Sequence, residues 1–393
     1  MELPELEDLP LEEGTRALVR VDFNVPLRDG VIEDDLRITT ARPTLDSLLA
    51  RGAAVVTCGH LGRPKGAPDP KYSMAPVAAR LGELLGFEVP LAPAVVGPDV
   101  EKLTAELEPG RVLMLENLRF EPGETANASD FVDSLERLAD VYVNEAFGAS
   151  HRAHASIVGL PPRLPSAAGE LMRHEVAVLS RLLDAPRRPF VAVLGGAKVS
   201  DKLGVIRALL ERCDTILVGG AMTFTFVAAE GGSIGDSLVE PDLVQECKAL
   251  LATGRVRLPT DVVIARDIAA DAATKIVPVD AIPAGWKGLD IGPEAAGQFA
   301  DEVESAATVL WNGPMGVFEV EPFAAGTKTV AEAVAATSAY TVVGGGDSAA
   351  AIRDFGLASE VDHVSTGGGA SLELIEQGDL PGLRALRESA RRE

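Results

Sequence analysis

The sequence predicts an α/β fold with two doubly wound parallel sheets. Short apolar runs alternate with segments of helical spacing along nearly the whole chain, the pattern of parallel strands joined by helices. The chain has 393 residues, which is long for a single hydrophobic core, so two domains are expected. Apolar residues make up 47% of the chain, enough to bury both sheets.

In the first half, four apolar runs are predicted to be strands. They span residues 17–25, 53–61, 111–120 and 141–147. The segments between them show helical spacing with Gly or Asp near their ends, which predicts helices over 39–52, 75–86 and 130–140.

The second half repeats the alternation without repeating the sequence. Its predicted strands span 190–196, 215–222, 261–265, 308–313 and 340–346. Its predicted helices include 201–213 and 241–254. Because the two halves share no obvious sequence pattern, no internal repeat is predicted.

The boundary between the halves is expected at residues 159–170. This stretch has the densest prolines of the chain and no apolar period. The helical run 171–184 follows it and would act as a stiff connector.

Composition and charge exclude several classes of protein. The net charge of −23 disfavours nucleic acid or an anionic membrane as a partner, because its field repels polyanions. The longest uncharged apolar stretch, 215–229, is shorter than the roughly 18 residues that a membrane helix needs. The acidic N-terminus lacks the basic and apolar regions of a signal peptide. We therefore expect a soluble cytoplasmic protein, in which the widely spaced Cys58, Cys213 and Cys247 are buried reduced thiols.

Polar side chains follow the first predicted strand. Asp22 and Asn24 are separated by one residue and can exchange hydrogen bonds with a ligand hydroxyl. An ordinary exit from strand to loop remains the alternative. In open parallel sheets ligands bind beyond the carboxyl ends of the strands, which is where Asp22 and Asn24 would lie.

Several cations are expected at the same edge of the first sheet, where they would hold a small anion. A single Gly-Arg-Pro loop is often only a turn, but several cations at strand ends favour function. These residues are Arg37, His60, Arg63, Arg119 and Arg152. His151 and His154 lack a third ligand, so no metal pair is expected there.

In the second half, Lys198 and Lys202 follow a strand that ends in two glycines. Neither the order GxxxxGK[ST] nor GxGxxG is present, so this is neither a Walker A loop nor a dinucleotide fingerprint. A helix beginning near Ser200 or Asp201 would let both lysines project from one side of its first turn. Both are predicted to meet a transferring phosphate.

Two triple-glycine segments, 344–346 and 367–369, each precede a predicted helix and can present backbone N–H groups to phosphate. Asp347 is expected to cap its helix, to bind Mg²⁺, or to do both. Asn312 and Glu319 are polar groups in an otherwise apolar loop. Glu319 would accept a hydrogen bond from a ribose hydroxyl, or it is a solvated loop acid.

Together these motifs resemble the phosphoglycerate kinase family over essentially the whole chain. They occur in that family's order and spacing: RVDFNVP (20–26), GHLGRP (59–64), LENLRFEPGE (115–124), HRAHAS (151–156), LGGAKVSDK (194–202), WNGPMGVFE (311–319), GGGDS (344–348) and STGGGASLELIE (365–376).

The resemblance implies two Rossmann-like domains joined by a hinge helix. The implied boundaries are 1–168 for a domain that binds 3-phosphoglycerate, 169–185 for the hinge helix, 186–375 for a nucleotide-binding domain, and 376–393 for a tail returning to the first domain. The implied reaction is reversible phosphoryl transfer from 1,3-bisphosphoglycerate to ADP, with Mg²⁺ as cofactor and a monomeric enzyme.

The resemblance also assigns site residues. The implied phosphoglycerate ligands are Asp22, Phe23, Asn24, Arg37, His60, Leu61, Gly62, Arg63, Arg119 and Arg152. The implied nucleotide ligands are Lys202, Gly288, Asn312, Glu319, Gly345, Gly346, Asp347 and Ser348, with Gly367, Gly368 and Gly369 as a phosphate nest and Asp347 as the metal ligand. Arg37, Lys198 and Lys202 would act on the phosphoryl group in transit.

The chain departs from the commonest family pattern at Glu145, the pair Ala149-Ser150, Ala221 and Ser348, none of them a charged catalytic position. Two other functions fit the sequence less well. A nicotinamide-dependent dehydrogenase would need GxGxxG followed by an acidic residue, which neither half supplies. A two-lobed anion-binding protein without catalysis would not need two lysines and two glycine nests in one lobe.

Overall fold

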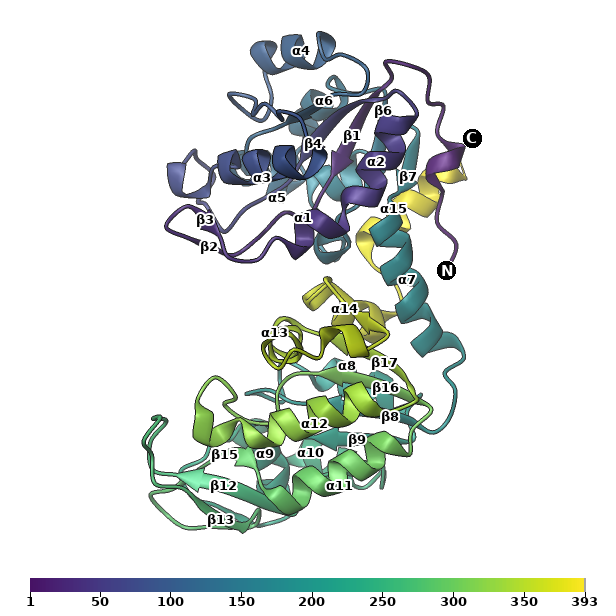
Figure 1. Ribbon diagram of the computed structural model, residues 1–393. Helices are drawn as coiled ribbons and strands as arrows, with labels where there is room; N and C mark the ends of the chain where they lie inside the picture. The colour runs from purple at the N-terminus through teal and green to yellow at the C-terminus, as the bar shows by residue number, and fades with distance from the viewer. Residues whose placement is uncertain (392–393) are drawn as a thin grey trace. The chain divides into compact units, whose positions relative to one another are not determined.

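The computed structural model describes residues 1–391, which fold into two compact units (Figure 1). Unit 1 comprises Met1–Ala177 together with the chain from Asp379 onwards, and unit 2 comprises Val178–Gly378. The division falls inside helix α7 (Glu170–Asp184). It does not fall in the proline-rich stretch 159–170, whose last residues contribute to strand β7 (Ser166–Ala168).

The sheet of unit 1 is parallel, as predicted, but it has five strands where four were predicted; β7 is the additional one. Their spatial order is β5 (Val112–Met114), β4 (Ala54–Cys58), β1 (Arg16–Arg20), β6 (Val141–Asn144) and β7. The predicted runs 17–25 and 53–61 extend past the ends of β1 and β4, and these extra residues form the loops that carry the candidate ligands. Every residue of β4, β5 and β6 is buried, the pattern of a sheet covered on both faces.

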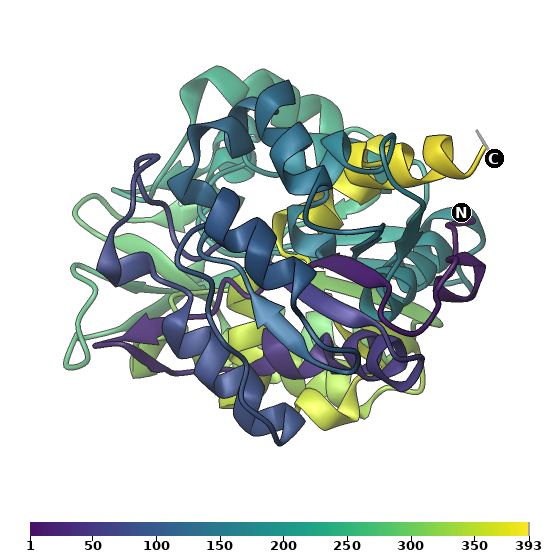
Figure 2. The same cartoon turned by 90° about the horizontal axis from the view of Figure 1, so that it is seen from above.

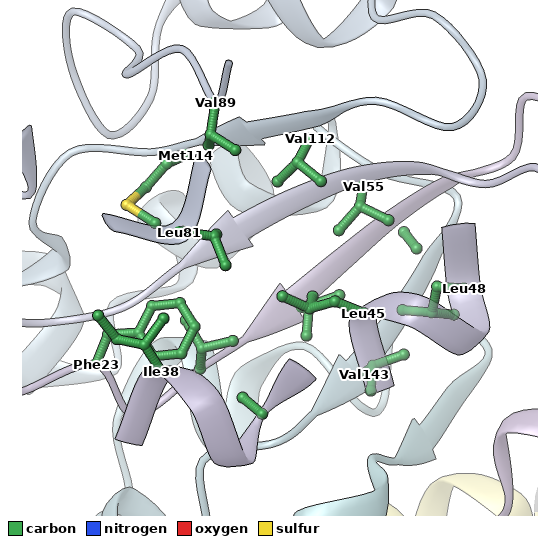
Figure 3. Close-up of a cluster of buried hydrophobic side chains, with 14 of the residues drawn as sticks. Phe23, Ile38, Leu45, Leu48, Val55, Leu81, Val89, Val112, Met114 and Val143 are labelled. Atoms are coloured by element: carbon green, nitrogen blue, oxygen red, sulfur yellow. The ribbon is translucent and has the colours of Figure 1, made fainter. Parts of the chain in front are cut away.

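Helices α2 (Arg42–Ala50) and α3 (Ala75–Leu85) help to cover this sheet. Figure 3 shows Leu45 and Leu48 of α2 and Leu81 of α3 packed with Val55 and Val112 of the strands. Helix α3 has a proline in its first turn and ends at Gly86, whose φ of +78° suits a glycine cap.

The other elements of unit 1 are short. They are the hairpin β2 (Leu27–Arg28) and β3 (Val31–Ile32), helices α1 (Leu36–Thr40), α4 (Pro98–Ala105), α5 (Pro122–Ala126) and α6 (Ser129–Glu136), the 3-10 turns η1 (Leu6–Asp8), η2 (Pro70–Tyr72), η3 (Leu118–Phe120) and η4 (Phe147–Ala149), and the π-helical turn η5 (Ala155–Gly159).

A buried carboxyl group anchors the start of α7. Glu145, which follows β6, accepts hydrogen bonds from the Thr44 hydroxyl (2.7 Å) and from the backbone N–H of Leu171 (3.2 Å). Burial raises the pKa of Glu145 to about 8. Gly169 leaves space for this side chain, because a Cβ there would lie 1.9 Å from the Glu145 Oε2.

The main sheet of unit 2 has six parallel strands. Their order is β11 (Val256–Arg257), β9 (Thr215–Val218), β8 (Phe190–Leu194), β16 (Thr308–Asn312), β17 (Tyr340–Gly344) and β18 (His363–Val364). Helices α11 (Pro293–Glu304) and α12 (Ala325–Ala336) cover the face turned to the viewer in Figure 1. Phe299 and Val330 of these helices pack with Trp311 of β16 in the core.

A second sheet in unit 2 is antiparallel. The predicted strand 261–265 exists as β12 (Asp261–Ala265), but it pairs with β13 (Lys275–Pro278) and β15 (Lys287–Ile291) instead of joining the parallel sheet. The connection from β12 to β13 is too short for a crossover helix, so the strands run antiparallel. Two further short strands, β10 (Ser233–Ile234) and β14 (Ala281–Ile282), pair with each other.

The remaining helices of unit 2 are α8 (Leu203–Leu210), α9 (Thr223–Ala229), α10 (Val244–Leu251), α13 (Gly346–Asp354) and α14 (Gly369–Gln377), with the 3-10 turns η6 (Pro241–Leu243), η7 (Glu321–Phe323) and η8 (Ala358–Glu360). None of the helices described in residues 1–391 combines the length and apolar character of a membrane span.

The last helix, α15 (Pro381–Ala390), packs on unit 1. It contacts β7 and η5, and the Gly382 N–H donates to the Ser150 carbonyl (2.9 Å). Figure 2 shows α15 in yellow beside the teal segments of unit 1. Leu383 and Leu386 on this helix are fully buried, so α15 completes the core of unit 1.

Candidate functional site

Asp22 and Asn24 lie on the loop that leaves β1 and are held in defined orientations. The Asp22 Oδ2 accepts a hydrogen bond from Arg37 (2.5 Å), and the Asn24 Oδ1 accepts one from the Gly62 N–H (2.8 Å). The Asp22 Oδ1 is buried and has no partner among the described residues. Asp22 therefore keeps one acceptor for a ligand hydroxyl, and Asn24 turns its amide NH₂ away from Gly62.

The loop after β4 requires glycine at position 62. Its φ is +61°, and a Cβ there would lie 2.4 Å from the ring of Tyr72. The Gly62 carbonyl accepts from Arg119 (2.8 Å), so this loop links Asn24 to the guanidinium. The side chains of Phe23 and Leu61 belong to the hydrophobic core, where they anchor the two loops.

The predicted cations of unit 1 come close enough to one another to interact electrostatically. Burial, followed by the charges of Arg20, Arg119 and Arg37, holds the pKa of His60 well below its usual range. Burial lowers the pKa of Arg119 as well, and the charges of Arg20, Arg63 and Arg152 contribute. Arg63 and Arg152 themselves are exposed. This concentration of mutually repelling cations is stabilised best by a bound anion.

Sequence reasoning missed the buried polar residues beneath this cluster. Arg20 lies at the end of β1 and is 1% exposed, and Glu124 is equally buried. The hydroxyl of Ser156 connects them, because it accepts from the Arg20 Nε (2.9 Å) and donates to the Glu124 Oε1 (2.7 Å). The available signal was a charged residue inside an otherwise apolar strand.

In unit 2, Lys202 reaches the end of strand β16. Its Nζ donates to the Asn312 carbonyl (2.8 Å) and also to the Asn312 Oδ1. Burial lowers the pKa of Lys202 to about 8, against the opposing charges of Asp347 and Asp201. The ammonium group is therefore partly buried at the carboxyl ends of the strands.

The predicted helical geometry of the two lysines is wrong. Helix α8 begins at Leu203, later than expected near Ser200 or Asp201, and Lys202 is its N-cap residue. Lys198 precedes the helix in an irregular, exposed segment. The two side chains therefore do not share one helical turn.

A buried donor faces the first triple-glycine loop. The Asn312 Nδ2 is buried and has no hydrogen-bond partner among the described residues. A Cβ at position 345 would lie only 2.8 Å from the Asn312 Nδ2, so the close approach requires glycine there. The φ of Gly345 is +92°. An unpaired buried N–H beside a glycine loop is suited to an incoming oxyanion.

Ser348 has a structural position behind this loop. Its buried hydroxyl donates to the Gly344 carbonyl and accepts from the Gly313 N–H (3.1 Å). It therefore ties the ends of β16 and β17 together, whereas Asp347 and Gly346 beside it are exposed.

An open cavity of about 510 Å³ lies next to these groups. Its lining includes the predicted residues Gly288, Glu319 and Asp347. It also includes an apolar wall formed by Ala221, Leu238, Ile268, Leu289 and Val317, of which only Ala221 was singled out from the sequence. At Gly288 a Cβ would lie 2.0 Å from the Phe224 ring. The size and lining suit a planar base with a polar tail.

The second glycine segment, 367–369, precedes α14 and is separate from the lining of this cavity. Gly368 has a φ of +53°, and a Cβ at Gly368 or Gly369 would meet nothing within 4 Å. Packing therefore leaves open space above this backbone.

The metal chemistry of the described residues is limited. Within residues 1–391 no three His, Cys, Asp or Glu side chains form a group able to hold a metal ion. Asp347 is one of three carboxylates that line the cavity, with Asp236 and Glu319. Mg²⁺ in nucleotide sites is commonly bound by one or two carboxylates plus phosphate oxygens, so Asp347 fits that role.

Comparison with known proteins gives one family. The family model described as phosphoglycerate kinase matches residues 6–378. A curated phosphoglycerate kinase of Frankia alni is 55% identical over 97% of this chain and 99% of its own length. That of Rubrobacter xylanophilus is 54% identical over 99% of both chains.

Solved structures agree with this result. The structure of phosphoglycerate kinase from Coxiella burnetii matches with a TM-score of 0.87 and 37% identity, covering 98% of this chain and 99% of its own. The crystal structure of the Pyrococcus horikoshii enzyme matches with a TM-score of 0.88 and 32% identity over the full length of both chains.

Proposed function

Since the chain belongs to the phosphoglycerate kinase family, we propose that unit 1 binds the phosphoglycerate and unit 2 binds the nucleotide. The enzyme transfers a phosphoryl group reversibly from 1,3-bisphosphoglycerate to ADP, giving 3-phosphoglycerate and ATP. The assignment of one substrate to each unit rests on one observation. In each unit, cations and polar atoms without a hydrogen-bond partner gather at the carboxyl ends of the parallel strands.

The site in unit 1 suits a small phosphorylated hydroxy acid. Arg37, Arg63, Arg119 and Arg152 would neutralise the phosphate and carboxylate, while Asp22 and Asn24 bind the hydroxyl. His60 adds a directional hydrogen bond. The backbones of Phe23, Leu61 and Gly62 place these side chains on their loops.

The site in unit 2 suits ADP or ATP. The apolar wall and Gly288 would receive the adenine, and Glu319 would accept from a ribose hydroxyl. Lys202, Asn312 and the loop of Gly345, Gly346, Asp347 and Ser348 would meet the phosphates. Residues 367–369 would offer further backbone N–H groups to the phosphoryl group in transit.

Mg²⁺ would be held by Asp347 together with the nucleotide, where it would supply positive charge to the phosphates. The reacting carboxylate and phosphate oxygens are already ionised near neutral pH, so no general base is required. The reaction requires that two anions are aligned and that their repulsion is offset. Arg37, Lys198 and Lys202 would supply the positive charge for this.

Helix α7 would act as a hinge, because its residues are divided between the two units. Closure about it would exclude water, which competes with ADP for an acyl phosphate.

We further propose a monomeric cytoplasmic enzyme without nucleic-acid or membrane partners, in keeping with its strongly acidic composition.

A coupled assay tests the function directly. With Mg²⁺, ADP and enzymatically generated 1,3-bisphosphoglycerate, the purified protein is expected to form ATP. Glycerate, which lacks the phosphate, should be a much poorer acceptor in the reverse reaction because it cannot engage the cations of unit 1. Binding of both ligands without ATP formation would instead favour the two-lobed binding protein.

The lowered pKa of Lys202 predicts an alkaline limb in the pH profile. The ammonium group loses its proton as pH rises through about 8, so kcat/KM for the nucleotide should fall in that range. In Lys202→Arg the guanidinium stays protonated, and this limb should disappear whatever the overall rate. An unchanged limb in that variant would assign the titration to another group.

A further inference from the structure

Arg20 contacts the ring of His60 from inside the protein. One guanidinium nitrogen of Arg20 lies 3.2 Å from the His60 Nδ1. Both side chains are buried, with exposed fractions of 1% for Arg20 and 7% for His60. Such a contact between a permanently charged group and an imidazole restricts the states that the imidazole can adopt.

The direction of this hydrogen bond follows from the chemistry of arginine. A guanidinium has five N–H donors, no acceptor, and does not lose its proton in proteins. The His60 Nδ1 must therefore be the acceptor and must carry no proton. In a neutral imidazole with a bare Nδ1, the single proton is on Nε2.

We propose that Arg20 is a positioning residue that holds His60 as the neutral Nε2–H tautomer, so that the ring offers one fixed N–H donor to the phosphoglycerate. This inference rests on the proposed function, in which His60 belongs to the substrate site. It adds Arg20, which is too deeply buried to touch the substrate, as the group that sets the chemistry of His60.

Arg20 is itself fixed on its other sides. It donates to the Val21 carbonyl and to the Ser156 hydroxyl, and through that hydroxyl it is linked to the carboxylate of Glu124. Glu124 also accepts from the Ser156 N–H (3.0 Å). The charge is thus balanced at a distance. Within residues 1–391 the hydrogen bonds of Arg20 end on Ser156, Val21 and His60, and not on a carboxylate that would compete with His60.

The surroundings of His60 oppose its protonation. Burial is the main cause, and the charges of Arg20, Arg119, Arg37 and His154 act in the same direction on its pKa. A substrate anion would therefore meet a neutral donor of fixed direction, in contrast to the fully charged arginines around it. Its hydrogen bond should not require proton uptake when the substrate binds.

Nitrogen-15 NMR of the imidazole rings tests the tautomer in the unmodified enzyme. The two nitrogens of His60 should show one pyrrole-type shift at Nε2 and one pyridine-type shift at Nδ1, unchanged across the neutral range. His60→Gln and His60→Asn identify the His60 resonances. A proton on Nδ1, or an imidazolium ring, would overturn the proposal without touching the function of the enzyme.

A variant of Arg20 tests the positioning role. In Arg20→Met, His60 should populate both tautomers, and KM for 3-phosphoglycerate should rise by about tenfold with a smaller change in kcat. Arg16→Lys, at the other end of the same strand, is the matched control and should leave both the tautomer and KM unchanged. An unaltered tautomer in a folded Arg20 variant contradicts the proposal.

If the Arg20 variant does not fold, Ser156→Ala gives the same test, because it removes the acceptor that orients the Arg20 Nε. In Ser156→Ala, His60 should also populate both neutral tautomers. The two His60 variants separate this inference from the site assignment. Gln supplies an N–H near the position of Nε2 and should preserve KM better than Asn does. Equal, unaltered KM values in both would show that His60 does not bind substrate.

Discussion

Replacing Lys202 with alanine is expected to lower kcat by about 10²-fold or more, with a much smaller effect on nucleotide affinity. The Lys202 Nζ lies at the end of β16, where it is partly buried and donates hydrogen bonds to Asn312. A charge in such surroundings stabilises the developing charge of a transferring phosphoryl group more strongly than it stabilises bound ADP. The variant removes that charge and leaves the apolar wall of the cavity intact.

Steady-state kinetics in both directions, together with calorimetric titration of ADP, would measure this effect. Lys248→Ala is a suitable control, because Lys248 is an exposed lysine on α10 in the same unit. It should behave as the unmodified enzyme does. A raised KM for ADP with an unchanged kcat in Lys202→Ala would show that Lys202 only binds the nucleotide.

Arg37→Ala should reduce kcat/KM for the phosphoglycerate by roughly 10²-fold and leave the affinity for Mg-ADP nearly unchanged. Arg37 is paired with Asp22 in unit 1, whereas the cavity and Lys202 belong to unit 2. Loss of the guanidinium removes a charge from the anion site and frees the carboxylate of Asp22, which then repels the substrate.

The control for this experiment lies at the start of the next helix, α2. Arg42 forms an exposed ion pair with Asp46, and Arg42→Ala should change activity little because such pairs contribute little to stability. Calorimetry of Mg-ADP binding to both variants completes the test. An equal loss of nucleotide binding and of turnover in Arg37→Ala would contradict the assignment of the two substrates to separate units.

The sequence was sufficient to predict eight of the eleven strands of the two parallel sheets, because each of the eight is a run of β-branched and apolar residues. It missed β7, β11 and β18, which have only two or three residues each. It did not identify α11 or α12, although Ala295, Phe299 and Val303 of α11 lie at helical spacing. It also did not reveal that β12 belongs to an antiparallel sheet, since a strand's partner is decided by the chain that follows it.

The candidate site was predicted where its residues follow strands, since the loops at strand ends are recognisable from the sequence. Arg20 escaped notice because its importance comes from burial and from contact with His60, forty positions away in the chain. The wall at Leu238 and Ile268 escaped for a similar reason, since no local pattern distinguishes it. The arrangement of Lys198 and Lys202 differed because α8 begins only at Leu203.

The packing of α15 on unit 1 has a consequence for folding during translation. Unit 2 is one uninterrupted stretch of chain, whereas unit 1 needs both its early residues and the final helix. A ribosome thus delivers every residue of the later unit before it delivers the last piece of the earlier one. During translation the apolar surface of unit 1 that Leu383 and Leu386 later cover is therefore exposed. For this reason unit 1 is the unit that would benefit most from a chaperone.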